Sequence, residues 1–244
     1  MNPFEAQAYI MGNIKKTEEI EISLGEALGF YTSKPVISSD GSIVLEKGER
    51  IDSRRLIFAK MFNIKRVSVH RKPVIRIDLE DDNIRKLLTL IVVEEGFKLG
   101  YGKADFIITS NRPQRVEFLV SKVEQKPASN LAFFVDNRGT AGFYINGSLS
   151  DIIVATYVFI LPALRSAFGS ANPYQKKMYL QSANSYQRTL GGKSIFIPAR
   201  ITDDSLVEIL NPDEENYLLC DALIHITPDM FGIQEEQEVE VYLL

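Results

Sequence analysis

The chain has 244 residues, of which 45% are apolar and 25% are charged, as in an ordinary soluble globular protein with a substantial core. A formal net charge of -4 argues against general binding to a phosphate backbone, so we expect no nucleic-acid partner. The single cysteine, Cys220, excludes an internal disulfide framework and indicates a reducing compartment. Asn2, Glu5 and Gln7 interrupt any signal-peptide core, so the expected location is the cytoplasm.

Residues 1–70 predict an N-terminal helical or linker segment. Residues 1–38 are expected to be helical, with either a helix start or a short strand near 20–22. A strand at 43–45, a helix at 53–62 and a strand at 65–70 follow. Asp52 is a good N-cap for the second helix, because its side chain can accept a free backbone N–H of the first turn. Pro35 and the Asp40-Gly41 turn separate these elements.

Strands and helices alternate from residue 74 onward, which predicts an α/β domain with a mostly parallel sheet. The expected elements are a strand at 74–78, a helix at 84–95, strands at 104–110 and 116–123, a hairpin of strands 131–135 and 141–145, and a long helix after residue 148. Pro162 and Arg165 interrupt the apolar run of this helix before about 20 residues, so we expect it to be buried rather than to cross a membrane.

Two polar strand ends are candidate binding positions. Asp81 and Asp82 follow the strand 74–78, and carboxylates at the carboxyl edge of an open α/β sheet can hold a metal or a ligand. The alternative, which the sequence favours, is a solvated helix start, where the helix dipole favours negative charge. Gly147 and Ser148 form a turn into the long helix, whose free N–H groups suit an anion, although such a turn can also be a simple connection.

A change in composition near residue 171 predicts a second domain, 171–244, made of β-strands. The expected strands are 194–201, 205–210, 222–227 and 238–243, after a polar stretch at 174–190 with helical or strand-like character. His70, His225 and Cys220 each lie among apolar neighbours, so we expect structural roles for them. The sequence contains no P-loop, strand-associated GxGxxG, HExxH or cysteine pair for zinc.

The order of several segments resembles that of the molybdopterin molybdotransferase family, which includes MoeA and the E domain of gephyrin. The segments are KGERIDSRRLIFAKMFNIKRVSVHRKPVIRID, ADFIITS, KPASNLAFF, GFYINGSLSDIIVATYVFILPALRSAFG and ALIHITPDMFGIQEEQEVEVYLL. This resemblance implies a homodimer with a three-layer α/β molybdopterin-binding-like domain over 71–170, followed by a small C-terminal all-β domain over 171–244. It also implies insertion of molybdenum from molybdate into adenylylated molybdopterin, with magnesium.

The family resemblance also assigns site residues. Asp81 and Asp82 match its acidic pair, which implies a role in catalysis and in binding magnesium. Contacts with the anionic phosphate of molybdopterin are implied for Thr109, Ser110, Lys126, Gly147, Ser148 and Ser150.

Departures from the family pattern affect these loops. Leu79 and Glu80 stand where the family has a small Thr-Gly pair, and the glycine-rich loop after Ser110 contains Arg112 and Pro113 instead. These residues cannot supply the close, open backbone N–H groups that glycines provide.

Two larger pieces of the family are missing from this chain, namely the inserted β domain between Ser38 and Asp40 and a helix–strand unit between Gly102 and Ala104. We therefore predict a MoeA-like protein related to molybdenum cofactor biosynthesis with a degenerate molybdate-insertion site. One alternative is a non-catalytic dimeric binding or regulatory module that kept only the scaffold. Another is an enzyme that acts on a small anionic metabolite through the same strand ends.

Overall fold

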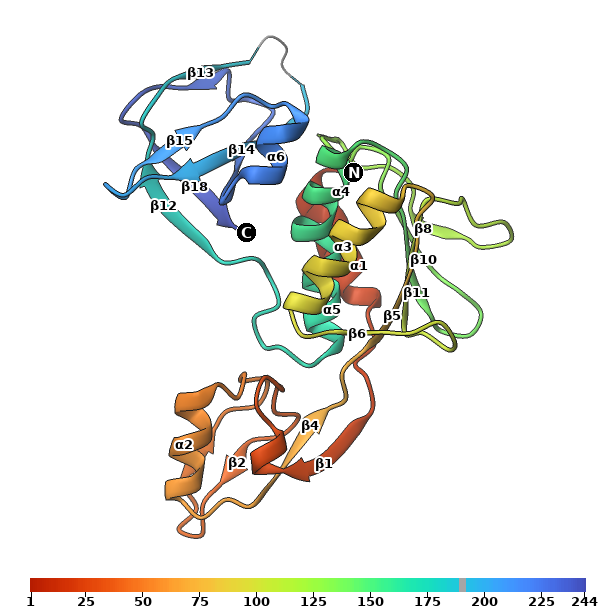
Figure 1. Ribbon diagram of the computed structural model, residues 1–244, viewed down its shortest axis with the longest axis vertical. Coiled ribbons are helices and arrows are strands. Elements are labelled where there is room, and N and C mark those ends of the chain that lie inside the picture. The colour runs from red at the N-terminus through yellow and green to blue at the C-terminus, as the bar shows by residue number, and fades with distance from the viewer. Residues whose placement is uncertain (189–191) are drawn as a thin grey trace.

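The computed structural model describes residues 1–188 and 192–244, which form an N-terminal lobe, a central α/β domain and a C-terminal β domain (Figure 1). Helix α1 (Pro3–Asn13) comes first in the sequence but packs on the central domain. Asn2 caps α1, since its side chain accepts the N–H groups of Phe4 and Glu5, and Glu5 accepts the N–H of Asn2 in return.

The N-terminal lobe has a core of its own. Strand β1 (Glu19–Ser23) pairs antiparallel with β4 (Arg66–His70), and β2 (Val36–Ile37) pairs with β3 (Ile43–Leu45) beside α2 (Ser53–Met61). The core residues are Leu24, Ala27, Val36, Val44, Leu45, Ile51, Ala59, Val67 and Val69. The segment 1–70 is therefore one helix and a folded lobe rather than a helical linker.

Two local predictions in the lobe can be compared directly with the structure. The Asp52 side chain accepts the Arg55 N–H at 2.8 Å, which confirms the predicted N-cap of α2. The α-helix expected within 1–38 is confined to α1, because Ile20 and Ile22 alternate with glutamates and form a strand, as the alternative prediction for 20–22 required.

The central sheet has the strand order β6-β5-β7-β11-β10-β8. Its strands are β5 (Val74–Asp78), β6 (Lys98–Leu99), β7 (Phe106–Thr109), β8 (Phe118–Val120), β10 (Ala132–Val135) and β11 (Ala141–Tyr144). Strands β5, β6, β7 and β11 are parallel, whereas β10 runs antiparallel to β8 and β11. The three adjacent parallel strands β5, β7 and β11 therefore end at one edge of the sheet.

Helices cover one face of this sheet. In Figure 1, α1, α3 (Asp82–Glu94) and the long helix after β11 all lie on the same side of the strands. Ile108, Phe133 and Phe143 share that side by register and are fully buried in the main core with these helices. This contact between sheet and helices is the largest apolar core of the described chain.

The opposite face carries loops instead of helices (Figure 1). Phe134 lies on this face outside the main core, with its ring over Gly142 and 5.8 Å from the ring of Phe118. Between β6 and β7 the chain passes from Leu99 to Phe106 with no helix. The described residues of this domain thus form two layers and not the expected three, because nothing helical follows β6 to cover this face.

The long helix begins at Leu149 and contains a π-helical turn (Thr156–Ile160) between α4 (Leu149–Ala155) and α5 (Leu161–Ala167). Pro162 has no N–H to donate to the carbonyl of Val158, and the Gln7 amide donates to that carbonyl at 2.5 Å. By length and composition Leu149–Ala167 could span a membrane, contrary to the expectation from Pro162 and Arg165, but 72% of its most apolar window is buried inside the protein.

The C-terminal domain is a sheet with the order β12-β18-β16-β14-β15, and β9 from the central domain adds to β14. The strands are β9 (Gln125–Lys126), β12 (Lys177–Gln181), β14 (Ser194–Ile201), β15 (Val207–Ile209), β16 (Ala222–Ile226) and β18 (Glu238–Leu243), and β13 (Tyr186–Gln187) pairs separately with β17 (Gly232–Ile233). Its expected all-β content is incomplete, because Asp213 caps a helix, α6 (Glu214–Leu219). The polar stretch at 174–190 is strand-like where described, and residues 189 and 190 lie outside the described chain.

A bidentate ion pair joins the start of the central domain to the start of β7. Arg71 donates to both carboxylate oxygens of Asp105 at 2.7 Å, and Asp105 also accepts the Val74 N–H at 2.8 Å. Burial acts to raise the pKa of Asp105, but these hydrogen bonds outweigh it and hold the pKa below its usual value.

We expect Asp105→Asn to lower the free energy of unfolding by about 1–2 kcal/mol at pH 7, since the charged acceptor is lost. Because the folded pKa is depressed, this contribution is present above the ordinary carboxyl pKa and is lost as the pH falls through the folded value. Urea unfolding between pH 7 and pH 3 should therefore show the two proteins converging in acid. Asp204→Asn, on an exposed turn, is the matched control and should show little difference at any pH.

Candidate functional site

The predicted site residues fall into two groups along the carboxyl edge of the sheet. Asp78, at the end of β5, is paired in register with Thr109 of β7, and Thr109 is paired with Tyr144 of β11. The first group follows β5 and β7 and contains Asp81, Asp82, Thr109 and Ser110. The second group surrounds the start of α4 and contains Lys126, Gly147, Ser148 and Ser150.

Asp81 and Asp82 are engaged in the start of α3. Asp81 is its N-cap and accepts the N–H groups of Asn83 and Ile84 at 2.8 and 3.0 Å, while Asp82 forms an ion pair with Arg85. A magnesium ion would compete with both interactions. In the described chain there is also no group of three or more His, Cys, Asp or Glu residues placed to hold a metal. Asp81 therefore acts as a helix cap, as the second reading of the sequence expected, and magnesium binding by the two carboxylates stays a prediction.

Thr109 bonds within its own loop, and Ser110 bonds to the loop after β5. The Thr109 hydroxyl oxygen accepts the Asn111 N–H at 3.0 Å, and the Ser110 hydroxyl oxygen accepts the Glu80 N–H at 3.0 Å. This second bond places the end of β7 against the loop after β5, as expected for neighbouring parallel strands. The Thr109 hydroxyl also donates to the Asn111 carbonyl at 3.3 Å and is buried, whereas Ser110 is partly exposed and its hydroxyl can still donate.

Arg112 occupies the region beyond this loop. Its guanidinium lies 4.8 Å from the centre of the Phe118 ring and 5.6 Å from that of Tyr144. Arg115, in the same loop, has a positive φ of 68°, a backbone conformation that residues other than glycine rarely adopt. The loop that would need bare backbone near a ligand therefore presents stacked side chains instead.

Two members of the second group, Lys126 and Ser150, line a pocket of about 630 Å³ between the central and C-terminal domains, whereas Gly147 and Ser148 are not among its lining residues. Lys126 reaches it from β9 and Ser150 from the first turn of α4, while Arg188 and Lys193 reach it from the C-terminal domain. The three cations give the pocket a positive charge that only Asp151 opposes among its lining residues. A pocket of this size and charge suits a small anionic ligand.

Asp151 holds the two loops beside this pocket together. One carboxylate oxygen accepts the Ala128 N–H at 2.5 Å, and the other accepts the N–H and the hydroxyl of Ser148 at 2.9 and 3.0 Å. A Cβ on Gly147 would lie 2.2 Å from the same carboxylate, so only glycine fits at this turn. Ser148 and Asp151 thus form the predicted helix start, with the dipole favouring the carboxylate.

Ser150 faces the C-terminal domain. Its N–H and hydroxyl both donate to the carboxylate of Glu214 in α6, at 2.7 and 2.9 Å. The Glu214 carboxylate thus accepts the backbone N–H of Ser150, which an anionic ligand at the helix start would otherwise accept. Glu214 had no signal in the sequence, because it lies 64 residues away in a helix that was not predicted. Arg188 and Lys193 had none either, since neither lies in a recognisable motif.

The buried titratable groups of the C-terminal domain are in their neutral forms. Burial raises the pKa of the Cys220 thiol to about 11 and lowers the pKa of His225 to about 4. Burial also raises the pKa of Tyr217, whose hydroxyl donates to the Phe196 carbonyl at 2.6 Å. Near pH 7 the Cys220 sulfur is therefore a thiol and not a thiolate, and the His225 ring is uncharged. Both states agree with the structural roles expected for these two residues.

No model of a protein family matches the sequence, and no curated protein matches it. Solved structures do match. A molybdenum cofactor biosynthesis protein from Pyrococcus furiosus superposes with a TM-score of 0.82 at 18% identity, over 100% of this chain and 99% of that one. A molybdopterin biosynthesis MoeA protein from Pyrococcus horikoshii superposes with a TM-score of 0.80 at 13% identity, over 100% of both chains. The chain has a MoeA-like fold.

The likeness to MoeA extends over the whole chain, and the low identity agrees with a divergent sequence. A second structure of the Pyrococcus horikoshii MoeA protein gives the same TM-score of 0.80 at 11% identity. At these identities the MoeA-like fold is established, and function must be argued from the residues of the site.

Proposed function

We propose that this MoeA-like protein acts in molybdenum cofactor biosynthesis by binding an anionic pterin, and that its molybdate-insertion site is degenerate. The observation that carries the proposal is the meeting of Lys126 and Ser150 in one cationic pocket between the two domains. These residues come from separate segments, and the family resemblance assigned both to the pterin phosphate. Lys126 is the phosphate contact in this proposal, because the N–H and hydroxyl of Ser150 already donate to Glu214. The proposal includes a homodimer, as that resemblance implies, and a cytoplasmic location, as the residues near the N-terminus led us to expect.

Two features support loss of insertion activity. Asp81 and Asp82 bond to α3 and Arg85, so they are not a free acidic pair for a metal-assisted reaction. Arg112 stacks on Phe118 and Tyr144 where the family has glycines, so the loop offers side chains in place of open backbone N–H groups. The alternative of a binding or regulatory module that kept only the scaffold differs in one respect: it would need no pterin at all.

Isothermal titration with molybdopterin-AMP tests the proposal. We expect saturable binding that Lys126→Gln weakens about tenfold or more, because a close charge contact with phosphate is lost. Lys60→Gln, an equal charge change on exposed α2, should leave the affinity within about twofold. Molybdate and magnesium added to the complex should give no bound molybdenum by elemental analysis. Molybdenum insertion would contradict the degenerate site, and absence of pterin binding would favour the scaffold-only module.

A further inference from the structure

A second pocket, of about 640 Å³, lies at the opposite edge of the central sheet from the proposed pterin pocket. It is lined by the residues that precede β7 and β11, by the turn between β10 and β11, and by the segment after α1. The two pockets share no lining residue.

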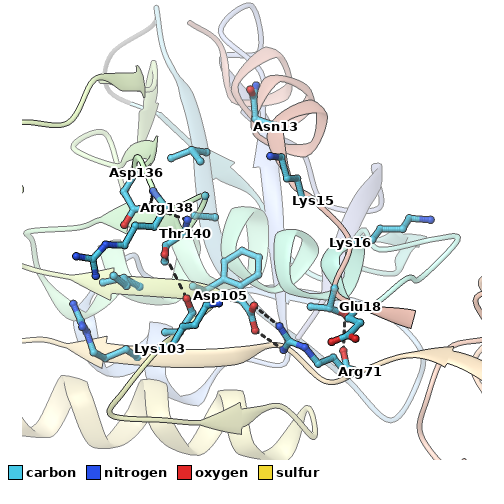
Figure 2. A pocket seen from close by; sticks show the side chains of 18 of the residues that line it. Asn13, Lys15, Lys16, Glu18, Arg71, Lys103, Asp105, Asp136, Arg138 and Thr140 are labelled. Carbon is cyan, nitrogen blue, oxygen red and sulfur yellow. Dashed lines mark hydrogen bonds and ion pairs between the residues drawn. The ribbon is translucent and has the colours of Figure 1, made fainter. Parts of the chain in front are cut away.

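Unpaired cations surround this pocket, although the protein has a net charge of -4. The cations are Lys15, Lys16, Arg76, Lys103 and Arg138, and none has an ion-pair partner within residues 1–188 and 192–244. Figure 2 shows Lys15, Lys103 and Arg138 around the hollow, while Lys16 points away from it. Such a concentration of one charge attracts small anions.

The carboxylates of the same pocket offset only part of this charge. Asp105 is held by Arg71 in the bidentate pair that Figure 2 shows at one side of the pocket. Asp136 accepts the N–H groups of Arg138 and Thr140 at 2.9 and 2.8 Å, which closes the turn after β10. Glu18 is the third carboxylate and is exposed to solvent. The cations therefore exceed the acids in number, and two of the three acids are already bonded.

Arg76 supplies the most specific evidence. It projects from β5 on the face of the sheet that lacks helices, and its Nε is buried without a hydrogen-bond acceptor among the described residues. A buried charged N–H without an acceptor is unfavourable, because the group has lost its water without gaining a partner. An oxyanion in the pocket would supply the acceptor, and a guanidinium group matches phosphate oxygens in pairs.

We propose that this pocket binds a small organic phosphate or diphosphate, with Arg76 and Arg138 contacting the phosphate oxygens. The volume exceeds that of a single phosphate and is within the range of pockets for organic ligands. Phe106, Ile107 and Val135 also line it and can contact a less polar part of the ligand. The proposal is independent of the pterin pocket and names a second site on the same domain.

Titration with inorganic pyrophosphate at constant ionic strength tests this site. The wild-type protein should bind saturably, and Arg76→Gln and Arg138→Gln should each weaken binding about tenfold or more. Arg76→Lys keeps the charge but loses the paired donors, so it should lie between these values. Lys60→Gln should leave the affinity within about twofold. Arg138 is exposed, so its variant keeps the test valid even if an Arg76 variant fails to fold.

The other outcomes also decide the matter. Loss of binding in Lys126→Gln but not in the arginine variants would place the pyrophosphate in the pterin pocket and overturn the second site. Equal weakening by Lys60→Gln and Arg138→Gln would reduce the effect to general electrostatics and overturn it as well. Two binding events, one removed by each set of variants, would support both pockets.

Discussion

Replacement of Phe143 by alanine should lower the free energy of unfolding by about 3–5 kcal/mol, a large part of the 5–15 kcal/mol that stabilises a typical domain. Phe143 is fully buried on the face of β11 that meets the helices, and its ring lies 5.2 Å from that of Phe133. The lost side chain would leave a cavity among α4, α5 and the sheet that the surrounding helices cannot fill. Urea unfolding followed by circular dichroism measures the loss.

Phe118→Ala is the matched control on the other face of the same sheet. Phe118 is only partly buried and contacts Phe134, Tyr144 and the Arg112 guanidinium rather than a helix. Its truncation should cost about 1–2 kcal/mol, because less apolar area leaves water on folding. Equal losses in the two variants would mean that both faces are covered to the same extent, which would contradict the two-layer arrangement.

Local signals in the sequence predicted many of the elements correctly. Asp52 and Ser148 start helices where their side chains and following residues suggested, because capping depends on residues only three positions apart. The apolar run ADFIITS forms β7 in the middle of the parallel part of the sheet. Patterns of this kind depend on nearest neighbours along the chain, so the sequence alone is sufficient to identify them.

Features that depend on distant residues could not be predicted in the same way. Whether a strand face is covered depends on which helices reach it, and the apolar strands gave no indication that only one face of the sheet has helices. The bond from Ser150 to Glu214 joins residues 64 positions apart and gives the first turn of α4 a protein partner in place of a ligand. The five unpaired cations, Arg76 among them, are scattered from Lys15 to Arg138 and become a cluster only when β5, the segments before β7 and after α1, and the turn after β10 come together.

The predicted functions of the acidic pair illustrate the same limit. Asp81 and Asp82 follow a strand and precede a helix, and that position suits both a metal and a helix cap. The sequence left both readings open. The bonds to Asn83, Ile84 and Arg85 show the capping role, since each uses a carboxylate oxygen within the first turn of α3, and the metal role stays a prediction.

Asp151→Ala should have the largest effect on the proposed pterin pocket. The carboxylate accepts three hydrogen bonds that tie the Lys126–Ala128 loop to the Gly147–Ser148 turn. A hydrogen bond to a charged acceptor contributes about 1.5–3 kcal/mol to stability, but the contributions of bonds to one carboxylate do not simply add. We therefore expect a loss of about 3 kcal/mol in the free energy of unfolding. We also expect the affinity for molybdopterin-AMP to fall about tenfold, because Lys126 would no longer be held beside Ser150.

Asp136→Ala separates these two effects. Asp136 also accepts two backbone N–H groups in a turn, but it lies at the other edge of the sheet and away from the pterin pocket. It should lower stability while leaving the molybdopterin-AMP affinity within about twofold. Ser148→Ala, which removes one of the three bonds to Asp151, should fall between the wild type and Asp151→Ala in both measurements. If Asp136→Ala and Asp151→Ala weakened the ligand equally, the loss would reflect global stability, and Asp151 would have no part in positioning the two loops for an anion.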